Sequence, residues 1–220
     1  MDRTVRIFGY ENREHRHDRI SSFSTHSLVA HTTSFDRSPD CIFRTHVGNL
    51  PEESWQVDSD NATLAHFARF ARVHRALAPY RAVLMERAYR TGAPPLRAAY
   101  LQYPTLLDAR VDRPQFFLGD DLLVAPVVGP LDTEVRVWFP PARRTDEGAA
   151  YDRCARRASS WTNVWTSETY GTADNSTTVV VGAPIGQPPV FYRTGCVVGE
   201  LLAATIRRAY NDEEVKGEGI

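Results

Sequence analysis

Several acidic side chains in the 220-residue sequence have a chemistry that could cleave a glycosidic bond. That reaction needs two carboxyl groups about 5–9 Å apart, one to protonate the leaving oxygen and one to act as nucleophile or base. The candidate acids occupy contexts typical of helix caps, turns and solvated loops: Asp36, Asp40, Asp58, Asp60, Asp120 and Asp121. Asp120 and Asp121 stand between Gly119 and an apolar run, a pattern that favours a turn over a catalytic pair.

His46 is the second candidate for chemistry, because it lies in a polar loop headed by an aromatic residue, Phe43-Arg44-Thr45-His46-Val47-Gly48-Asn49. A histidine can donate a hydrogen bond to a sugar hydroxyl, and an arginine two residues away can pair with a carboxylate. On these residues alone, a histidine that braces the loop is favoured over a substrate ligand, and both interpretations stay open.

The remaining histidines and cysteines fit no known metal or cofactor motif. His15, His17, His26, His31 and Cys41 have spacings that match no zinc ligand set. The sequence has no Gly-rich phosphate loop, no Gly-x-Ser-x-Gly elbow and no His-Glu-x-x-His helix. We therefore expect no metal and no cofactor.

The three cysteines, Cys41, Cys154 and Cys196, lie far apart and form no Cys-x-x-Cys pair. This odd number at wide spacing predicts no disulfide framework and favours a reducing compartment. We therefore expect a cytoplasmic protein.

The charge balance and the apolar segments exclude two classes of partner. The 26 basic and 27 acidic side chains leave a net charge of −1, so no general field attracts nucleic acid. No run approaches the roughly 18 apolar residues of a membrane span, and the first residues lack the apolar stretch of a signal peptide. We expect a soluble protein without nucleic-acid or membrane partners.

The clearest predicted element is a helix that begins after the capping side chain of Asp60. Apolar residues recur at steps of three or four and predict one buried face: Leu64, Phe67, Phe70, Val73, Leu77 and Tyr80. Pro79 lacks the N–H that a helix needs, so it predicts a kink or the start of a second helix that runs to Thr91. Gly92 then predicts a left-handed end.

The chain after Gly92 changes to short apolar segments separated by Gly, Pro and Asp. They predict strands at Leu96–Tyr103, Phe116–Leu118, Leu122–Val128, Val135–Phe139, Trp161–Trp165, Thr178–Val181, Val190–Tyr192 and Cys196–Val198. Val135, Val137 and Phe139 alternate with Arg136 and Trp138, as in a sheet with one face on a core. This spacing predicts an antiparallel sandwich or barrel.

Three further segments lack a core pattern. Residues 1–20 are charged and predict a poorly ordered arm, and residues 205–220 predict a charged tail. The arginine-rich insertion at 142–160 has almost no large apolar residue, so we interpret it as a solvated excursion, with anion binding as the less favoured alternative.

Five motifs, in order, resemble the C-terminal part of glycoside hydrolase family 31, in particular its sulfoquinovosidase branch and the related α-glucosidases. They are Phe43–His46, the helix Leu64–Tyr80, Thr91–Arg97, Gln115–Val127 with its Gly-Asp-Asp-Leu-Leu-Val-Ala-Pro run, and Ala183–Phe191. The resemblance extends over about residues 23–202.

The resemblance implies an α+β fragment. Members of the family are retaining α-glycosidases that have a (β/α)8 barrel followed by β-sandwich domains. Residues 21–103 would then form the last βα units of the barrel, and residues 104–204 a β-sandwich that carries the 142–160 insertion. His46 would contact the sugar in the −1 subsite, and the Asp120-Asp121 pair would belong to the sandwich.

The sequence also departs from the family pattern. The family's nucleophile and acid/base are aspartates on earlier barrel strands, and neither motif has a counterpart in this sequence. Leu28 replaces an acid of the family's Phe-Ser-x-Thr-His-Ser-Asp-Ile-Gly-Gly motif. We therefore expect a chain with no catalytic residue of its own. It would bind an α-glycoside or sulfoquinovoside weakly, hydrolyse neither alone, and have a complementary N-terminal barrel chain as a possible partner.

Two alternatives to a glycosidase fragment remain. One is a non-catalytic carbohydrate-binding β-sandwich with an aromatic platform, for which the candidates are Trp138, Trp161, Trp165 and Tyr170. The other is a purely structural partner that completes another chain's barrel. Exposure of two of these rings on one face would favour the binding module, whereas core packing would argue against it.

Overall fold

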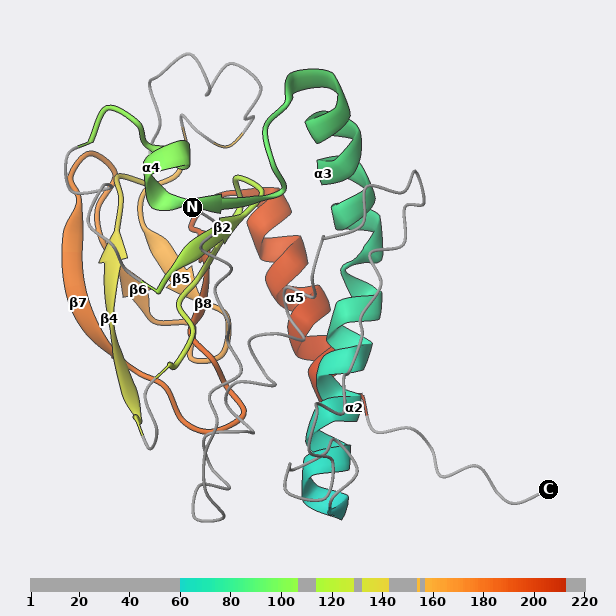
Figure 1. Cartoon of the computed structure of the whole chain (residues 1–220). Helices are drawn as coiled ribbons and strands as arrows, with labels where there is room; N and C mark the ends of the chain where they lie inside the picture. The colour runs from blue at the N-terminus through green and yellow to red at the C-terminus, as the bar shows by residue number, and fades with distance from the viewer. Residues whose placement is uncertain (1–59, 107–113, 129–131, 143–153, 155–156, 213–220) are drawn as a thin grey trace, which may run out of the picture.

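The computed structural model describes residues 60–106, 114–128, 132–142, 154 and 157–212. These residues form three layers (Figure 1). Helices α2, α3 and α5 cover one face of a six-stranded sheet, and a two-stranded sheet of β4 and β7 covers the opposite face. All the strand pairs in both sheets are antiparallel. The described part of the chain is therefore a small α+β structure.

The helical hairpin begins and ends where the sequence predicts. Helix α2 spans Asn61–Ala76, and its N-cap Asp60 accepts a hydrogen bond of 2.7 Å from the Thr63 N–H. Helix α3 spans Ala78–Thr91 with Pro79 in its first turn, and Gly92 ends it at a φ of 74°. The predicted buried face is confirmed at Phe70, Val73 and Leu77, but it is wrong at Leu64, which is 46% exposed.

The segment after Gly92 is not one strand, as the sequence predicts. Strand β1 covers only Leu96–Ala98, and the chain then turns into the short helix α4, Ala99–Gln102. The buried side of this turn carries Arg97, Ala99 and Gln102. The apolar run at 96–103 therefore divides into a strand that pairs with β2 and a helical turn that brings Gln102 toward the sheet end.

The six-stranded sheet has the order β1-β2-β3-β8-β5-β6. Its other strands are β2 Phe116–Leu118, β3 Leu122–Val124, β5 Trp161–Asn163, β6 Thr169–Tyr170 and β8 Val190–Arg193. The register aligns Phe117, Leu123 and Phe191 in one row across β2, β3 and β8. Because side chains alternate along a strand, this row faces the two-stranded sheet, and its neighbours along each strand face the helices.

Strands β4, Glu134–Phe139, and β7, Thr177–Gly182, form the second sheet. The core between the two sheets is rich in aromatic rings, and Phe139 meets Phe191 edge to face at 4.8 Å. The predicted alternation of β4 holds only near its start. Trp138 is 1% exposed, so both faces of the strand are buried at its C-terminal end.

Helix α5, Val197–Asn211, replaces a predicted strand and part of the predicted tail. Val197 and Val198 are β-branched and indicate a strand locally. The residues that follow have a helical spacing, however, because Leu202, Ile206 and Ala209 all lie on the buried face. Residues 205–211 therefore belong to a packed helix rather than to a charged tail.

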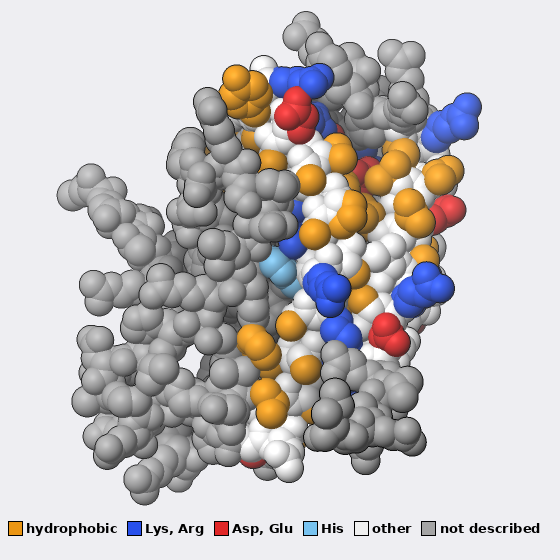
Figure 2. Space-filling model, turned by 90° about the vertical axis from the view of Figure 1, so that its right-hand side faces the viewer, with side chains coloured by type: hydrophobic (Ala, Val, Ile, Leu, Met, Phe, Trp, Pro, Cys, Tyr) orange, Lys and Arg blue, Asp and Glu red, His pale blue; other side chains and the backbone are white. Residues whose placement is uncertain are grey.

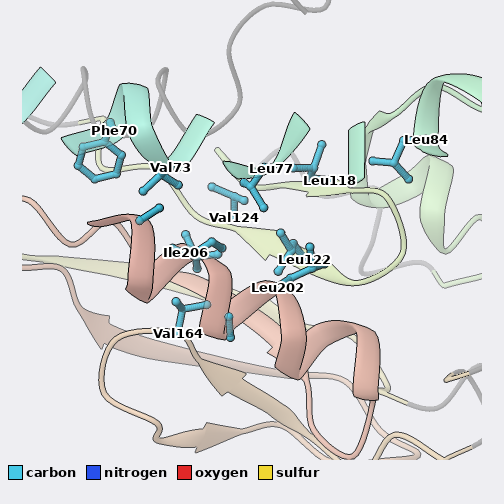
Figure 3. Packing of buried hydrophobic residues seen from close by; sticks show 13 residues of the cluster. Phe70, Val73, Leu77, Leu84, Leu118, Leu122, Val124, Val164, Leu202 and Ile206 are labelled. Atoms are coloured by element: carbon cyan, nitrogen blue, oxygen red, sulfur yellow. The ribbon is translucent and has the colours of Figure 1, made fainter. Parts of the chain in front are cut away.

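The core on the helix side of the sheet is mainly aliphatic (Figure 3). Phe70 and Val73 of α2 and Ile206 of α5 pack with Leu122 and Val124 of β3. Each such buried side chain contributes about 1.5–3 kcal/mol to folding. The helices are therefore attached to the sheet by one continuous apolar cluster.

The predicted solvated excursion at 142–160 is wrong for three of its described residues. Ala142 and Ala158 are completely buried in the core between the sheets, and Cys154 is 8% exposed. Residues 143–153 and 155–156, which carry most of the arginines, lie outside the described residues. Among the described helices, none is long and apolar enough to cross a membrane.

Candidate functional site

The predicted sugar ligand His46 and its loop at 43–49 lie outside the described residues, as does Leu28. The role of His46 therefore stays a prediction. The other sequence-predicted acids, Asp120 and Asp121, lie in the turn between β2 and β3, and here the structure brings several distant elements together.

Gly119 makes this turn possible. Its φ is 62°, in the left-handed region that other residues rarely adopt. A Cβ atom at this position would overlap the hydroxyl of Tyr80 and lie 2.7 Å from a methyl group of Leu84. The glycine therefore lets the turn approach α3 closely enough for the next two side chains to bind the elements around it.

Asp120 is the one fully buried carboxylate among the described residues. Its Oδ1 accepts hydrogen bonds from Arg97 at 2.7 Å and from Gln102 at 2.9 Å, and its Oδ2 pairs with Arg87. Burial alone would raise the pKa of the Asp120 carboxyl group. The attraction of Arg97, the Gln102 hydrogen bond and Arg87 together hold that pKa well below its usual range.

Asp121 binds the first turn of α3. The Tyr80 hydroxyl donates to Asp121 Oδ2 at 2.9 Å and also lies 3.1 Å from the Leu118 carbonyl oxygen. Burial, the negative charge of Asp121 and this hydrogen bond raise the pKa of Tyr80 well above its usual value. Tyr80 therefore stays protonated and acts as a donor at neutral pH.

The turn is therefore an ionic joint rather than an acid–base pair. A general acid or base must exchange a proton near the operating pH. The Asp120 carboxylate is held ionised by two arginines, and Asp121 is engaged by Tyr80. Both carboxylates position elements of the fold, in agreement with the turn role that the sequence indicates.

His74, at the C-terminal end of α2, is a buried titratable group that sequence reasoning did not single out. Its carbonyl oxygen accepts a hydrogen bond of 2.6 Å from Arg81. Burial and the nearby Arg81 charge lower the pKa of His74 to about 4. The imidazole is therefore neutral at pH 7, and His74 is buried in the last turn of α2.

A disulfide joins Cys154 and Cys196, although the sequence predicts no disulfide. The two cysteines are 42 positions apart in the sequence, and no local pattern predicts their pairing. They approach each other because the turn at 194–196 packs against residues 157–160. Cys196 is the N-cap of α5, and its Sγ lies 3.8 Å from Asp121 Oδ1. Because the two cysteines are paired, they no longer indicate a reducing compartment. The disulfide lies beside the β2–β3 turn.

The aromatic candidates for a sugar platform do not lie on one exposed face. Trp138 and Trp161 are 1% and 0% exposed. Trp165 packs at 5.0 Å from Tyr210 on the helix side of the sheet, whereas Tyr170 stacks on Phe139 at 5.2 Å at the inter-sheet core. Because the two partly exposed rings belong to opposite sides of the sheet, the structure gives the binding-module alternative no support.

The match to known proteins covers the region that has just been described. A family model for the glycosyl hydrolase family 31 C-terminal domain matches residues 92–198. This span includes the β2–β3 turn, both sheets and the start of α5.

Two curated relatives and one solved structure agree with this match. The sulfoquinovosidase of Escherichia coli (strain K12) is 32% identical over 163 residues, which cover 74% of this chain and 21% of the relative. The sulfoquinovosidase of Agrobacterium fabrum (strain C58 / ATCC 33970) is 31% identical over 152 residues, which cover 69% of this chain and 20% of the relative. A family 31 sulfoquinovosidase structure from E. rectale shares the fold, with a TM-score of 0.69 at 24% identity, and covers 92% of this chain and 26% of that chain.

The chain spans about a fifth of the length of the curated relatives that it matches. The matched region is the one that the family model describes as C-terminal. The chain therefore belongs to glycoside hydrolase family 31 and corresponds to the C-terminal part of its members.

Proposed function

We propose that this chain is the C-terminal, fold-supporting part of a glycosidase that hydrolyses O-glycosyl bonds in α-glycosides or sulfoquinovosides. The observation that carries the proposal is the family match over 92–198, together with two sulfoquinovosidase relatives above 30% identity. In this proposal most of residues 21–103 complete a (β/α)8 barrel. The sandwich that packs on it begins with β1, Leu96–Ala98, rather than at residue 104, because β1 pairs with β2.

The contacts of Asp120 and Asp121 favour a structural role for this chain over a catalytic one. Asp120 is committed to Arg87, Arg97 and Gln102, and Asp121 to Tyr80. Neither carboxylate is available for the acid–base steps of glycoside hydrolysis. We therefore propose that the 220 residues do not cleave a glycoside alone, and that catalysis uses aspartates outside them.

His46 is the residue of this chain that we propose to contact substrate, in the −1 subsite. Its hydrogen bond to a sugar hydroxyl would hold the ring but would not transfer the proton of the reaction. Loss of a hydrogen bond of this kind costs about 0.5–1.5 kcal/mol, or about 1.5–3 kcal/mol where a charged group is involved. The expected loss in kcat/KM is therefore between a few-fold and about 100-fold.

The helix layer supports the further proposal of an N-terminal barrel partner. Figure 2 shows hydrophobic side chains exposed between charged ones on this side of the molecule. Exposed apolar residues of the helices include Leu64, Val83 and Leu201, which are 46%, 64% and 65% exposed. A larger domain packed on the helices would cover such side chains.

A chimera tests the proposed role. Residues 21–204 replace the corresponding C-terminal part of the E. coli sulfoquinovosidase, and release of 4-nitrophenol from an aryl α-sulfoquinovoside is measured. We expect a folded chimera to hydrolyse this substrate. His46→Ala in the chimera should lower kcat/KM, whereas Tyr170→Phe, a change at the sheet face remote from the helices, should not. A chimera that unfolds cooperatively but is inactive on both the sulfoquinovoside and an aryl α-glucoside would contradict the proposal.

A further inference from the structure

The Cys154–Cys196 disulfide joins two segments that differ in how firmly they are held. Cys196 is completely buried, its N–H bonds the Arg193 carbonyl at 3.2 Å, and its carbonyl accepts the Glu200 N–H of α5 at 3.0 Å. Cys154 is 8% exposed and lies in a turn in which its carbonyl accepts the N–H groups of Arg157 and Ala158. Cys154 is therefore the slightly less enclosed residue of a pair in which both cysteines are buried.

Asp121 offers a hydrogen-bond acceptor to the Cys196 thiol that reduction of the disulfide would create. Its Oδ1 lies 3.8 Å from Cys196 Sγ, a distance at which a thiol can donate a hydrogen bond to an oxygen acceptor. Tyr80 holds the other carboxylate oxygen at 2.9 Å, so the acceptor is already in place. One ligand atom from each of Asp121, Cys154 and Cys196 lies within 4.8 Å of the others. Reduction would therefore leave the buried Cys196 thiol with a partner and not require the turn to move.

We propose that Cys154 and Cys196 form a reversible thiol–disulfide couple, in which Cys154 is the sulfur that exchanges with a soluble thiol and Cys196 is the resolving sulfur. The exchanging role goes to Cys154 because attack by a thiolate requires access, and Cys154 is the less enclosed of the two buried cysteines. An acceptor for the buried thiol is needed because an unpartnered buried donor is unfavourable.

The steps balance with a small disulfide as the oxidant. In oxidation, the Cys154 thiolate attacks one sulfur of glutathione disulfide, which forms a mixed disulfide and releases one glutathione thiolate. The Cys196 thiol loses its proton to solvent, and its sulfur attacks the Cys154 sulfur and expels the second glutathione thiolate. The protein loses two electrons and two protons, and one glutathione disulfide becomes two glutathione molecules. Reduction by two glutathione molecules follows the same path in reverse.

Trapping of the mixed disulfide tests the assignment. The full 220-residue chain is used with Cys41→Ser, so that only the two cysteines of the couple remain. Cys196→Ser, which places a good N-cap residue at the start of α5, is compared with Cys154→Ser after exposure to glutathione disulfide, and intact mass is followed with time. We expect glutathione to add to Cys154 in the first variant at least about tenfold faster than to Cys196 in the second.

A second measurement avoids cysteine substitutions in the couple. The Cys41→Ser chain is equilibrated without denaturant in buffers with a range of glutathione to glutathione disulfide ratios, alkylated rapidly and mapped by mass spectrometry. We expect full interconversion between the dithiol and the disulfide, with any mixed disulfide found on Cys154. We also expect the reduced form to unfold at a urea concentration about 1–2 M lower than the oxidised form. The reason is that the disulfide links residues 42 positions apart and so restricts the unfolded chain.

Three results would overturn the proposal. Glutathione addition to Cys196 at a rate equal to or faster than that of Cys154 would reverse the assigned roles. A pair that is converted only after denaturant is added would be a purely structural disulfide. A couple that stays reduced at every glutathione ratio would also contradict it.

Discussion

Strand β2 is anchored at both ends by buried polar side chains, and the two anchors differ in chemistry. Before the strand, the neutral Gln115 amide donates to the Trp138 carbonyl at 2.8 Å and accepts from the Trp138 N–H at 2.9 Å. After the strand, the Asp120 carboxylate binds Arg97, Arg87 and Gln102. The first anchor attaches the two-stranded sheet, and the second attaches α3, β1 and α4.

The difference shows how one short strand can organise three layers. A neutral amide satisfies both backbone polar groups of one residue of β4, Trp138, and carries no charge that must be balanced. A buried carboxylate can accept several donors, so it joins more elements, but its removal leaves positive charge without compensation. Substitutions at the two ends of β2 should therefore differ in size and in pH dependence.

Replacement of the charged anchor should have the largest effect. Asp120→Ala leaves the buried Arg97 guanidinium beside an apolar methyl group, and we expect a loss of about 3–5 kcal/mol in the free energy of unfolding. Urea unfolding followed by circular dichroism measures it. The matched control is Asp132→Ala, an exposed acid, which should change stability by less than about 0.5 kcal/mol. Equal effects at the two positions would show that the ionic joint does not hold the elements together.

The charged anchor should also lose strength in acid. The folded-state pKa of Asp120 lies below its unfolded value, so its contribution is complete above about pH 4 and is lost as the pH falls toward the folded value. The stability difference between the native chain and Asp120→Asn should therefore narrow below about pH 4. His74 titrates in both proteins and cancels in this comparison. A difference that stays constant down to pH 2 would contradict the assignment.

The glycine of the turn should come next in size. Gly119→Ala adds a Cβ that overlaps the Tyr80 hydroxyl at a positive φ, and we expect a loss of roughly 2–4 kcal/mol from overpacking and backbone strain together. Gly92→Ala is the matched control, because Gly92 has a similar φ of 74° but nothing within 4 Å of its Cβ position. We expect this control to lose only about 1–2 kcal/mol. Thermal unfolding of both variants separates strain from overlap, and equal losses would exclude a close approach to α3.

Replacement of the neutral anchor, Gln115, should have a smaller effect on stability than replacement of Asp120 or Gly119. Gln115→Met removes both hydrogen bonds to Trp138 and keeps the volume of the side chain, so we expect a loss of about 1–3 kcal/mol. This loss should not depend on pH between 3 and 7. Gln115→Glu is the comparison, because its carboxylate can still accept from the Trp138 N–H but repels the carbonyl oxygen. Urea unfolding at several pH values distinguishes this anchor from Asp120, and an acid-dependent loss in Gln115→Met would contradict the contrast.

The parts of the fold that the sequence predicts well depend on local signals. Asp60, Pro79 and Gly92 define the helical hairpin because capping and backbone restriction act within a few residues. The prediction of a strand at Cys196–Val198 was wrong. Val197 and Val198 favour a strand locally, but packing of Leu202 and later residues on the sheet determines a helix.

The contacts that join distant elements involve pairs of residues that no local sequence pattern reveals. Arg97 and Asp120 are 23 residues apart, and Cys154 and Cys196 are 42 apart. Each pair meets only after the strands have taken their register. The sequence indicated correctly that Asp120 belongs to a turn, but it could not indicate which cations neutralise it. The proposed sugar ligand, His46, stays a prediction from family resemblance.

We propose that the two carboxylates of the β2–β3 turn support the fold and that the chain alone does not hydrolyse a glycoside. The most direct test is an assay of the purified 220-residue chain with aryl α-glucoside and aryl α-sulfoquinovoside substrates. We predict no release of the aryl alcohol above the uncatalysed rate, although the chain unfolds cooperatively. Turnover of either substrate that is abolished by Asp120→Asn or His46→Ala would contradict the account.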